Sequence, residues 1–131
     1  MSQSQFADSQ REEPRTVTDA GEMDSVLELL DDEDCRRVLS GTVDDALTVA
    51  EIGERFDIPQ STAYRKVEAL ADAGLLEEKL RVRSSGNHVS EYTCCVESVS
   101  LSIDGGSGIT LSLAHTESES PFPSAGRLFG G

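Results

Sequence analysis

Apolar residues recur at helical spacing through the first half of the chain and at alternate positions through the second half. The helical stripes predict four helices, which contain residues 23–30, 35–39, 49–56 and 63–70. From Leu75 onward, alternation of apolar and polar residues predicts two β-hairpins, over residues 75–95 and 96–114. The pattern therefore predicts an α+β fold in which helices precede strands.

The third and fourth predicted helices are separated by a very short break with clear boundary residues. Thr48 and Glu51 have the spacing of a capping box, which starts the third helix at Thr48. Asp57 can adopt the left-handed conformation that the turn needs, and Pro59 fixes the backbone where the fourth helix begins. Gly74 then ends that helix. Two amphipathic helices joined in this way are typical of a helix-turn-helix motif.

The fourth helix carries polar and basic residues away from its apolar stripe. Thr62, Arg65 and Lys66 fall at i, i+3 and i+4, so the spacing predicts that they share an exposed face. Arg65 can form two hydrogen bonds with guanine, and Gln60 with adenine, while Ser61 or Thr62 can reach bases or phosphate. These residue types predict a helix that reads the edges of DNA base pairs.

The hairpin that follows carries Lys79, Arg81 and Arg83 on alternate positions of its first strand, with Ser84–Asn87 as the turn. Such a basic hairpin suits contacts with phosphate groups or with the minor groove. The alternative is that Arg65 and Lys66 only solvate a helix and pair with neighbouring acids. The coincidence of turn, helix face and basic hairpin favours double-stranded DNA as the partner.

The formal net charge of −14 is unusual for a DNA-binding protein, but the charges are unevenly distributed. Residues 1–59 carry 5 basic and 16 acidic side chains, whereas residues 60–88 carry 5 basic and 4 acidic ones. Only two of the basic residues are lysines. This bias resembles proteins of haloarchaea, in which molar salt screens acidic surfaces. An ordinary acidic protein is the alternative interpretation.

Residues 24–95 resemble the winged helix-turn-helix domain of ArsR-type transcription regulators, particularly their haloarchaeal members. The similarity lies in the segments Ser61-Thr62-Ala63-Tyr64-Arg65 and Leu70-Ala71-Asp72-Ala73-Gly74-Leu75-Leu76. It implies DNA contact by Ser61, Thr62, Tyr64 and Arg65, and assembly as a homodimer. The metal-sensing members carry a Cys-x-Cys motif on a helix, and this chain has none, so metal-regulated repression is not implied.

We expect four segments along the chain. These are a disordered tail over 1–22, the winged helix-turn-helix domain over 23–95, a packing or dimerisation hairpin over 96–114 and a disordered tail over 115–131. The apolar face of the second hairpin should pack on the helices or on another subunit, since an isolated hairpin is marginal in water. That face comprises Val99, Leu101, Ile103, Ile109, Leu111 and Leu113.

Other functions have weaker support from the residues. No grouping of nucleophile and base, phosphate-binding glycine loop or metal-spaced His and Cys set is present, so we expect neither an enzyme nor a cofactor or metal site. The three cysteines are expected to be free thiols, and no apolar run reaches membrane-spanning length. We therefore expect a cytoplasmic protein. The main alternative is a winged helix used for protein contact in a transcription or antitoxin complex, which the overall acidity favours.

Overall fold

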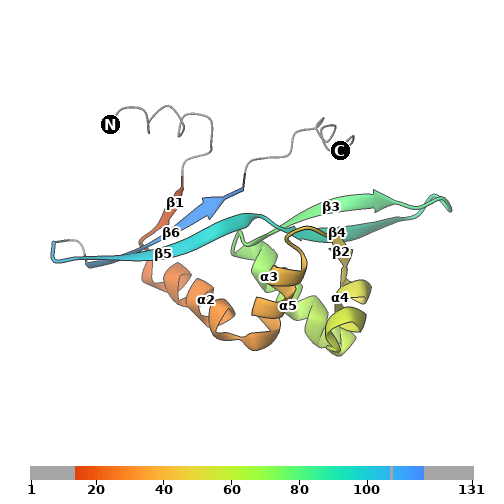
Figure 1. The fold of residues 1–131 in the computed structure, drawn as a ribbon, viewed down its shortest axis with the longest axis horizontal. Coiled ribbons are helices and arrows are strands. Elements are labelled where there is room, and N and C mark those ends of the chain that lie inside the picture. Colours follow the sequence, from red (N-terminus) through yellow and green to blue (C-terminus); the bar gives the residue numbers. More distant parts are fainter. Residues whose placement is uncertain (1–13, 107, 117–131) are drawn as a thin grey trace.

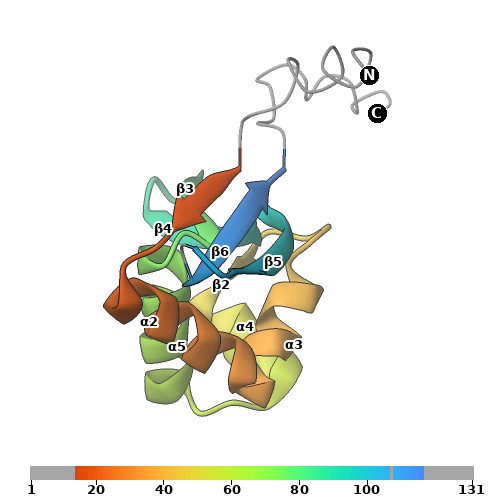
Figure 2. The same cartoon turned by 90° about the vertical axis from the view of Figure 1, so that its left-hand side faces the viewer.

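The computed structural model describes residues 14–106 and 108–116, which contain four helices and six strands. In chain order these elements are β1 (Arg15–Val17), α2 (Ala20–Asp31), α3 (Glu33–Gly41), β2 (Leu47–Thr48), α4 (Val49–Phe56), α5 (Gln60–Asp72), β3 (Leu76–Val82), β4 (His88–Cys94), β5 (Val96–Asp104) and β6 (Gly108–His115). The strands lie on one side of the four helices (Figures 1 and 2). The architecture is the predicted α+β winged helix-turn-helix, with an additional C-terminal hairpin.

The helix α4 begins and ends at the capping residues that the sequence predicts. At the start of α4, the Thr48 hydroxyl accepts from the backbone N–H of Glu51 at 3.1 Å, and the Glu51 carboxylate accepts from the Thr48 N–H at 2.9 Å. The Asp32 side chain caps α3 by accepting from the Cys35 N–H at 2.9 Å. Asp57 has a φ of 60°, so it supplies the left-handed residue between α4 and α5.

The turn between α4 and α5 is tight because Gly53, which has no side chain, lets the backbone of Ile58 lie close to α4. A Cβ atom at Gly53 would lie 2.9 Å from the carbonyl oxygen of Ile58, so a larger residue would force the turn apart. The Ile58 N–H donates to the Gly53 carbonyl at 2.9 Å. The α5 stripe then packs into the core, which includes the buried residues Val26, Val38, Ile52, Ala63, Val67, Leu70, Leu75, Leu111 and Leu113.

The strands form two antiparallel sheets within the described residues. One has the order β2-β4-β3 and forms the wing, and the other has the order β1-β6-β5. Figure 1 shows the β3–β4 and β5–β6 hairpins extending to opposite sides of the helices, with β4 and β5 following one another across the top. The backbone N–H of Cys94 donates to the Thr42 carbonyl at 2.9 Å, which anchors this crossing on the helical layer.

The predicted boundary of the N-terminal tail is wrong, because residues 15–22 belong to the fold. Arg15–Val17 pairs with Leu111–Leu113 of β6, and Val17 is buried in the core. The helix α2 starts at Ala20, where Asp19 accepts from the Glu22 N–H. A strand of three residues is too short to show alternation, so its pairing partner, far along the chain, decides its structure. Residues 1–13 and 117–131 of the two expected tails lie outside the described residues.

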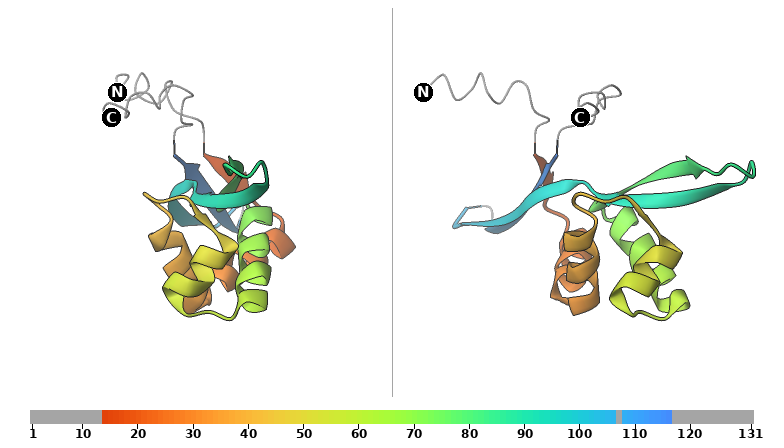
Figure 3. Two further views of the ribbon diagram at one scale, coloured as in Figure 1. Left: turned by 90° about the vertical axis from the view of Figure 1, so that its right-hand side faces the viewer. Right: turned by 45° about the vertical axis from the view of Figure 1, so that its right-hand side comes forward.

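The apolar face of the C-terminal hairpin is only half covered. Leu111 and Leu113 are fully buried, whereas Leu101, Ile109 and Ile103 are 51%, 49% and 82% exposed. The helices end below the inner half of the hairpin, and the outer half extends past them (Figure 3). The predicted packing on the helices is therefore confirmed for the inner half of the face and not for the outer half.

Candidate nucleic-acid interface

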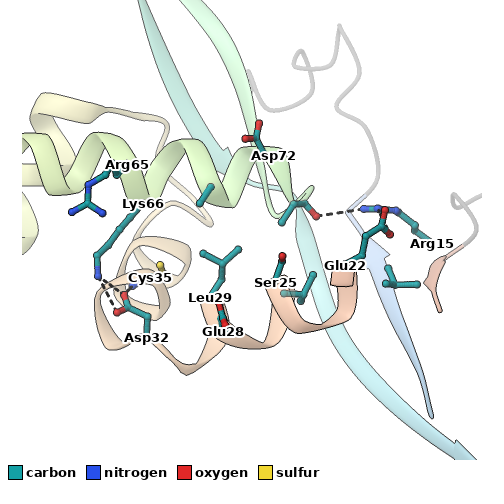
Figure 4. A pocket seen from close by; sticks show the side chains of 14 residues that line it. Arg15, Glu22, Ser25, Glu28, Leu29, Asp32, Cys35, Arg65, Lys66 and Asp72 are labelled. Atoms are coloured by element: carbon teal, nitrogen blue, oxygen red, sulfur yellow. Dashed lines mark hydrogen bonds and ion pairs between the residues drawn. The ribbon is translucent and has the colours of Figure 1, made fainter. Parts of the chain in front are cut away.

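The solvent-facing stripe of α5 is not the one that the spacing predicts. Ser61, Tyr64 and Arg65 are exposed, and the stripe continues through Glu68. Thr62, Lys66 and Ala69 are instead partly buried, and Lys66 and Ala69 line a pocket with Leu29 of α2 and Cys35 of α3 (Figure 4). The exposed face is thus displaced by one residue, about 100° around the helix, from the predicted face.

An ion pair holds the Lys66 side chain away from the exposed face of α5. Its Nζ lies 2.7 and 2.9 Å from the two carboxylate oxygens of Asp32 and 3.5 Å from Asp34 Oδ2. Figure 4 shows the Lys66 side chain extending from α5 to this cluster. The hydrogen bond from Lys66, with that from the Cys35 N–H, lowers the pKa of Asp32 to about 2. Lys66 thus holds α5 to the α2–α3 corner, and its predicted contact with DNA stays a prediction.

Arg65 has a different environment from its neighbour. Its side chain is exposed and, within residues 14–106 and 108–116, makes no ion pair or side-chain hydrogen bond. It lines an open groove between the start of α4, the exposed face of α5 and the wing. Gln60, Ser61 and Tyr64 line the same groove. Four of the predicted contact residues therefore lie together, whereas Thr62 lies on the adjacent flank.

The three basic residues of the wing also differ in their environments. Arg83 is exposed and lines the groove opposite Arg65, and Lys79 is exposed on β3. Neither has an ion-pair partner among the residues that the structure describes. Arg81, by contrast, donates to both Glu51 carboxylate oxygens at 3.1 Å and to Glu91 at 2.7 Å. Arg81 is therefore held by two carboxylates within the protein, and its predicted contact with phosphate or the minor groove stays a prediction.

The Arg81 pairs connect the wing to the start of α4. The two hydrogen bonds from Arg81, together with the Thr48 N–H, lower the pKa of Glu51 to about 2. The Glu51 carboxylate accordingly stays ionised while it completes the capping box of α4. Arg81, which pairs with Val89 near the turn of the hairpin, thus ties the outer part of β3 to the helix-turn-helix motif.

Two carboxylates lie in the groove beside the basic residues. Glu68 accepts from the Tyr64 hydroxyl at 2.9 Å, and this bond raises the pKa of Tyr64. Glu78 accepts from the Ser90 hydroxyl at 2.6 Å. Both hydroxyl groups are therefore held by acids within the protein. The sequence offered Glu68 as a partner of Arg65 or Lys66, whereas in the structure it pairs with Tyr64, its i, i+4 neighbour.

The start of α5 is available to an anion. No described side chain caps this helix, because Pro59 occupies the N-cap position, and its first turn contains no acidic residue. The start of α4, in contrast, is closed by the capping box. Backbone N–H groups and the helix dipole at an open helix start favour a phosphate group. Ser61 and Arg65 lie on this end of α5, so charge and geometry agree at the same place.

The three thiol groups and the His115 imidazole do not line this groove. Cys35, Cys94 and Cys95 are free, and burial raises the pKa of Cys35 to about 12 and that of Cys95 to about 11. His115 is within 3.2 Å of the Gly74 carbonyl oxygen. No group of three or more His, Cys, Asp or Glu residues in the described ranges is arranged to hold a metal ion.

Comparison with protein families gives one finding. Residues 30–79 match a family model described as a helix-turn-helix domain, a span that runs from the end of α2 into β3. No curated protein matches the sequence. The match and the fold support a DNA-binding regulator of the helix-turn-helix class. Among the helices of the described residues, none is long and apolar enough to span a membrane.

Proposed function

We propose that the protein is a transcriptional regulator that binds double-stranded DNA sequence-specifically, with α5 in the major groove and the β3–β4 wing on the DNA backbone. The observation that carries the proposal is Arg65 on the exposed face of α5, which has no ion-pair partner among residues 14–106 and 108–116 and lies near the uncapped start of that helix. In such a position Arg65 can donate two parallel hydrogen bonds to guanine. Gln60 and Ser61 can contact the adjoining bases or phosphate.

The wing supplies the second part of the interface. Arg83 lines the same groove as Arg65, and Lys79 is exposed on the same hairpin. Contacts of these side chains with phosphate groups position a protein on DNA without reading sequence. In this proposal Arg65 provides specificity, while Arg83 and Lys79 provide affinity. Arg81 and Lys66 maintain the geometry of the site from within the protein.

The finer classification is also part of the proposal. The segments Ser61–Arg65 and Leu70–Leu76 support an ArsR-type regulator, and the acidic, lysine-poor composition supports a haloarchaeal one that works in the cytoplasm at high salt. We propose that it acts as a homodimer. Two copies would then read two half-sites related by a two-fold axis.

Selection from a library of random DNA duplexes at molar KCl tests this function. The wild-type protein should enrich one short sequence with two-fold symmetry, whereas Arg65→Ala should enrich none or a relaxed one. Arg36→Ala is the matched control, because Arg36 is an exposed arginine on α3 away from the groove. Failure of the wild-type protein to enrich any duplex would contradict the proposal.

One observation favours the alternative of a protein-contact module. Glu68 and Glu78 lie in the groove, and the ion pairs of Lys66 and Arg81 reduce its positive charge. A basic peptide segment would suit these two carboxylates. The same library selection separates the alternatives, because a protein-contact module would retain no duplex above background at any salt concentration.

A further inference from the structure

The β5–β6 hairpin has an open edge and a partly uncovered face. In the sheet order β1-β6-β5, one side of β5 has no neighbouring strand among the described residues. Proteins commonly protect such an edge with lysine, proline or a very short strand. β5 is nine residues long and contains neither lysine nor proline. The edge can therefore accept another strand.

The uncovered face continues directly from the core. Cross-strand pairs Val99–Leu113, Leu101–Leu111 and Ile103–Ile109 form one apolar row along the hairpin. Exposure along this row rises from 0% at Leu113 to 82% at Ile103. β1 pairs only with the inner half of β6, so the outer half is a two-stranded ribbon. Such a ribbon is marginal in water unless its apolar face is covered.

We propose that a second copy of this chain covers the hairpin, with the two β5 strands pairing antiparallel about a two-fold axis. The resulting sheet would have six strands, in the order β1-β6-β5-β5-β6-β1. Antiparallel pairing places the outer half of each hairpin beside the inner half of its partner, where the helices lie. The exposed apolar residues would thereby gain the cover that their own helices do not provide.

The alternation of β5 fits this pairing in one register. If the axis passes beside Leu101, Leu101 lies opposite its own copy and Val99 lies opposite Ile103 of the other copy. Ser100 then faces Ser102, and Ser98 faces Asp104. Residues directly opposite in an antiparallel pair point to the same face. Every apolar side chain of this stretch therefore meets an apolar one, and no acid lies opposite an acid.

Charge favours a second copy over a different partner. The chain has a formal charge of −14, so two copies repel each other through most surfaces. Between Val96 and His115, Glu97 and Asp104 are the only acidic residues in the sequence, and they lie near opposite ends of β5. This hairpin is accordingly a surface that a like-charged copy can approach. A basic partner would gain nothing from it, because binding there depends on strand pairing and apolar contact.

The mass of the full chain in solution, measured by light scattering over a range of concentrations at molar KCl without DNA, tests the interface. Wild type should have the mass of two chains. Ile103→Asp should weaken the dimer by about tenfold or more, because it buries a charge in the interface. Val82→Asp is the control: Val82 is 67% exposed in the wing hairpin, and its replacement should leave the dimer intact.

Disulfide formation tests the register. Under mild oxidation Leu101→Cys should link two chains, since opposite residues lie about 4.5–5.5 Å apart at Cα. Ile103→Cys should not, because its two copies would be about 14 Å apart along the strands. A monomeric wild type, a dimer unaffected by Ile103→Asp, or no cross-link through Leu101→Cys would overturn the proposal. These results do not depend on DNA binding.

Discussion

Lys66 Nζ lies 2.7 Å from Asp32 Oδ2, and the same carboxylate caps α3 by accepting from the Cys35 N–H. The Asp32 side chain therefore caps the start of α3 and, through Lys66, also holds the middle of α5 against the α2–α3 corner. A basic residue in a DNA-recognition helix is ordinarily expected to face the DNA. Here the pairing turns Lys66 inward and leaves Arg65 as the basic side chain of α5 that faces the groove.

Removing the charge of Lys66 should affect stability rather than DNA recognition. Lys66→Met keeps most of the aliphatic chain and removes the ion pair, so the free energy of unfolding should fall by on the order of 1 kcal/mol. Asp32→Asn keeps a capping oxygen, and a double-mutant cycle with Lys66→Met isolates the coupling between the two side chains. Urea unfolding at constant salt measures it. Unchanged stability combined with lost DNA affinity would show that Lys66 is a contact residue after all.

The Glu51–Arg81 pair should make folding stability depend on acid pH. Because Arg81 and the Thr48 N–H lower the pKa of Glu51 from 4.5 to about 2, the unfolded chain binds the proton more readily between these values. The stabilisation is fully present above about pH 4.5 and is lost as the pH falls toward 2. Glu51→Gln should therefore lose less stability than wild type over this window.

Denaturant titrations at several pH values between these limits measure that effect. Glu54→Gln removes a negative charge from an exposed position of the same helix and serves as the control. If wild type and Glu51→Gln lose stability in parallel on acidification, the ion pair does not contribute as described.

The two halves of the C-terminal hairpin should respond differently to substitution. Leu111 is fully buried, so Leu111→Ala should cost about 2–5 kcal/mol. Ile103 is 82% exposed, so within one chain Ile103→Ala should change stability by about 0.5 kcal/mol or less. Thermal unfolding at a concentration where wild type is monomeric compares them. Equal destabilisation would mean that the outer half packs on the helices of its own chain.

Local signals made most of the helical architecture predictable. The capping box at Thr48, the left-handed Asp57 and the glycine at 74 each act within a few residues, so their consequences can be derived from sequence. β1 could not be found in this way. Its three residues fold only because β6, almost a hundred positions later, offers a pairing edge.

The site was less predictable than the fold, for a related reason. The spacing of Thr62, Arg65 and Lys66 correctly indicates that they are neighbours on α5. It does not show which flank the rest of the protein covers. Lys66 and Arg81 find their partners at positions 32 and 51, so their pairing depends on tertiary structure. Arg65 and Arg83 have no such partners within the described residues, so they remain the better candidates for DNA contact.

Salt should stabilise the protein rather than weaken it. The 16 acidic residues of positions 1–59 repel one another at low ionic strength, and added salt screens this repulsion. The melting temperature should rise between about 0.2 and 3 M KCl, a range over which screening becomes nearly complete. The salt dependence of DNA affinity should also be shallow or reversed. A melting temperature that falls with salt, together with a steep loss of affinity, would contradict the high-salt adaptation.

A titration with two duplexes tests whether Arg65 reads a base. Binding of wild type, Arg65→Ala and Arg36→Ala to the selected duplex and to a scrambled duplex is measured at a single KCl concentration, after each variant is shown to be folded. Arg65→Ala should lose about 1–3 kcal/mol on the selected duplex and little on the scrambled one, while Arg36→Ala should match wild type on both. Equal affinity of wild type and Arg65→Ala for the selected duplex would show that Arg65 does not read a base.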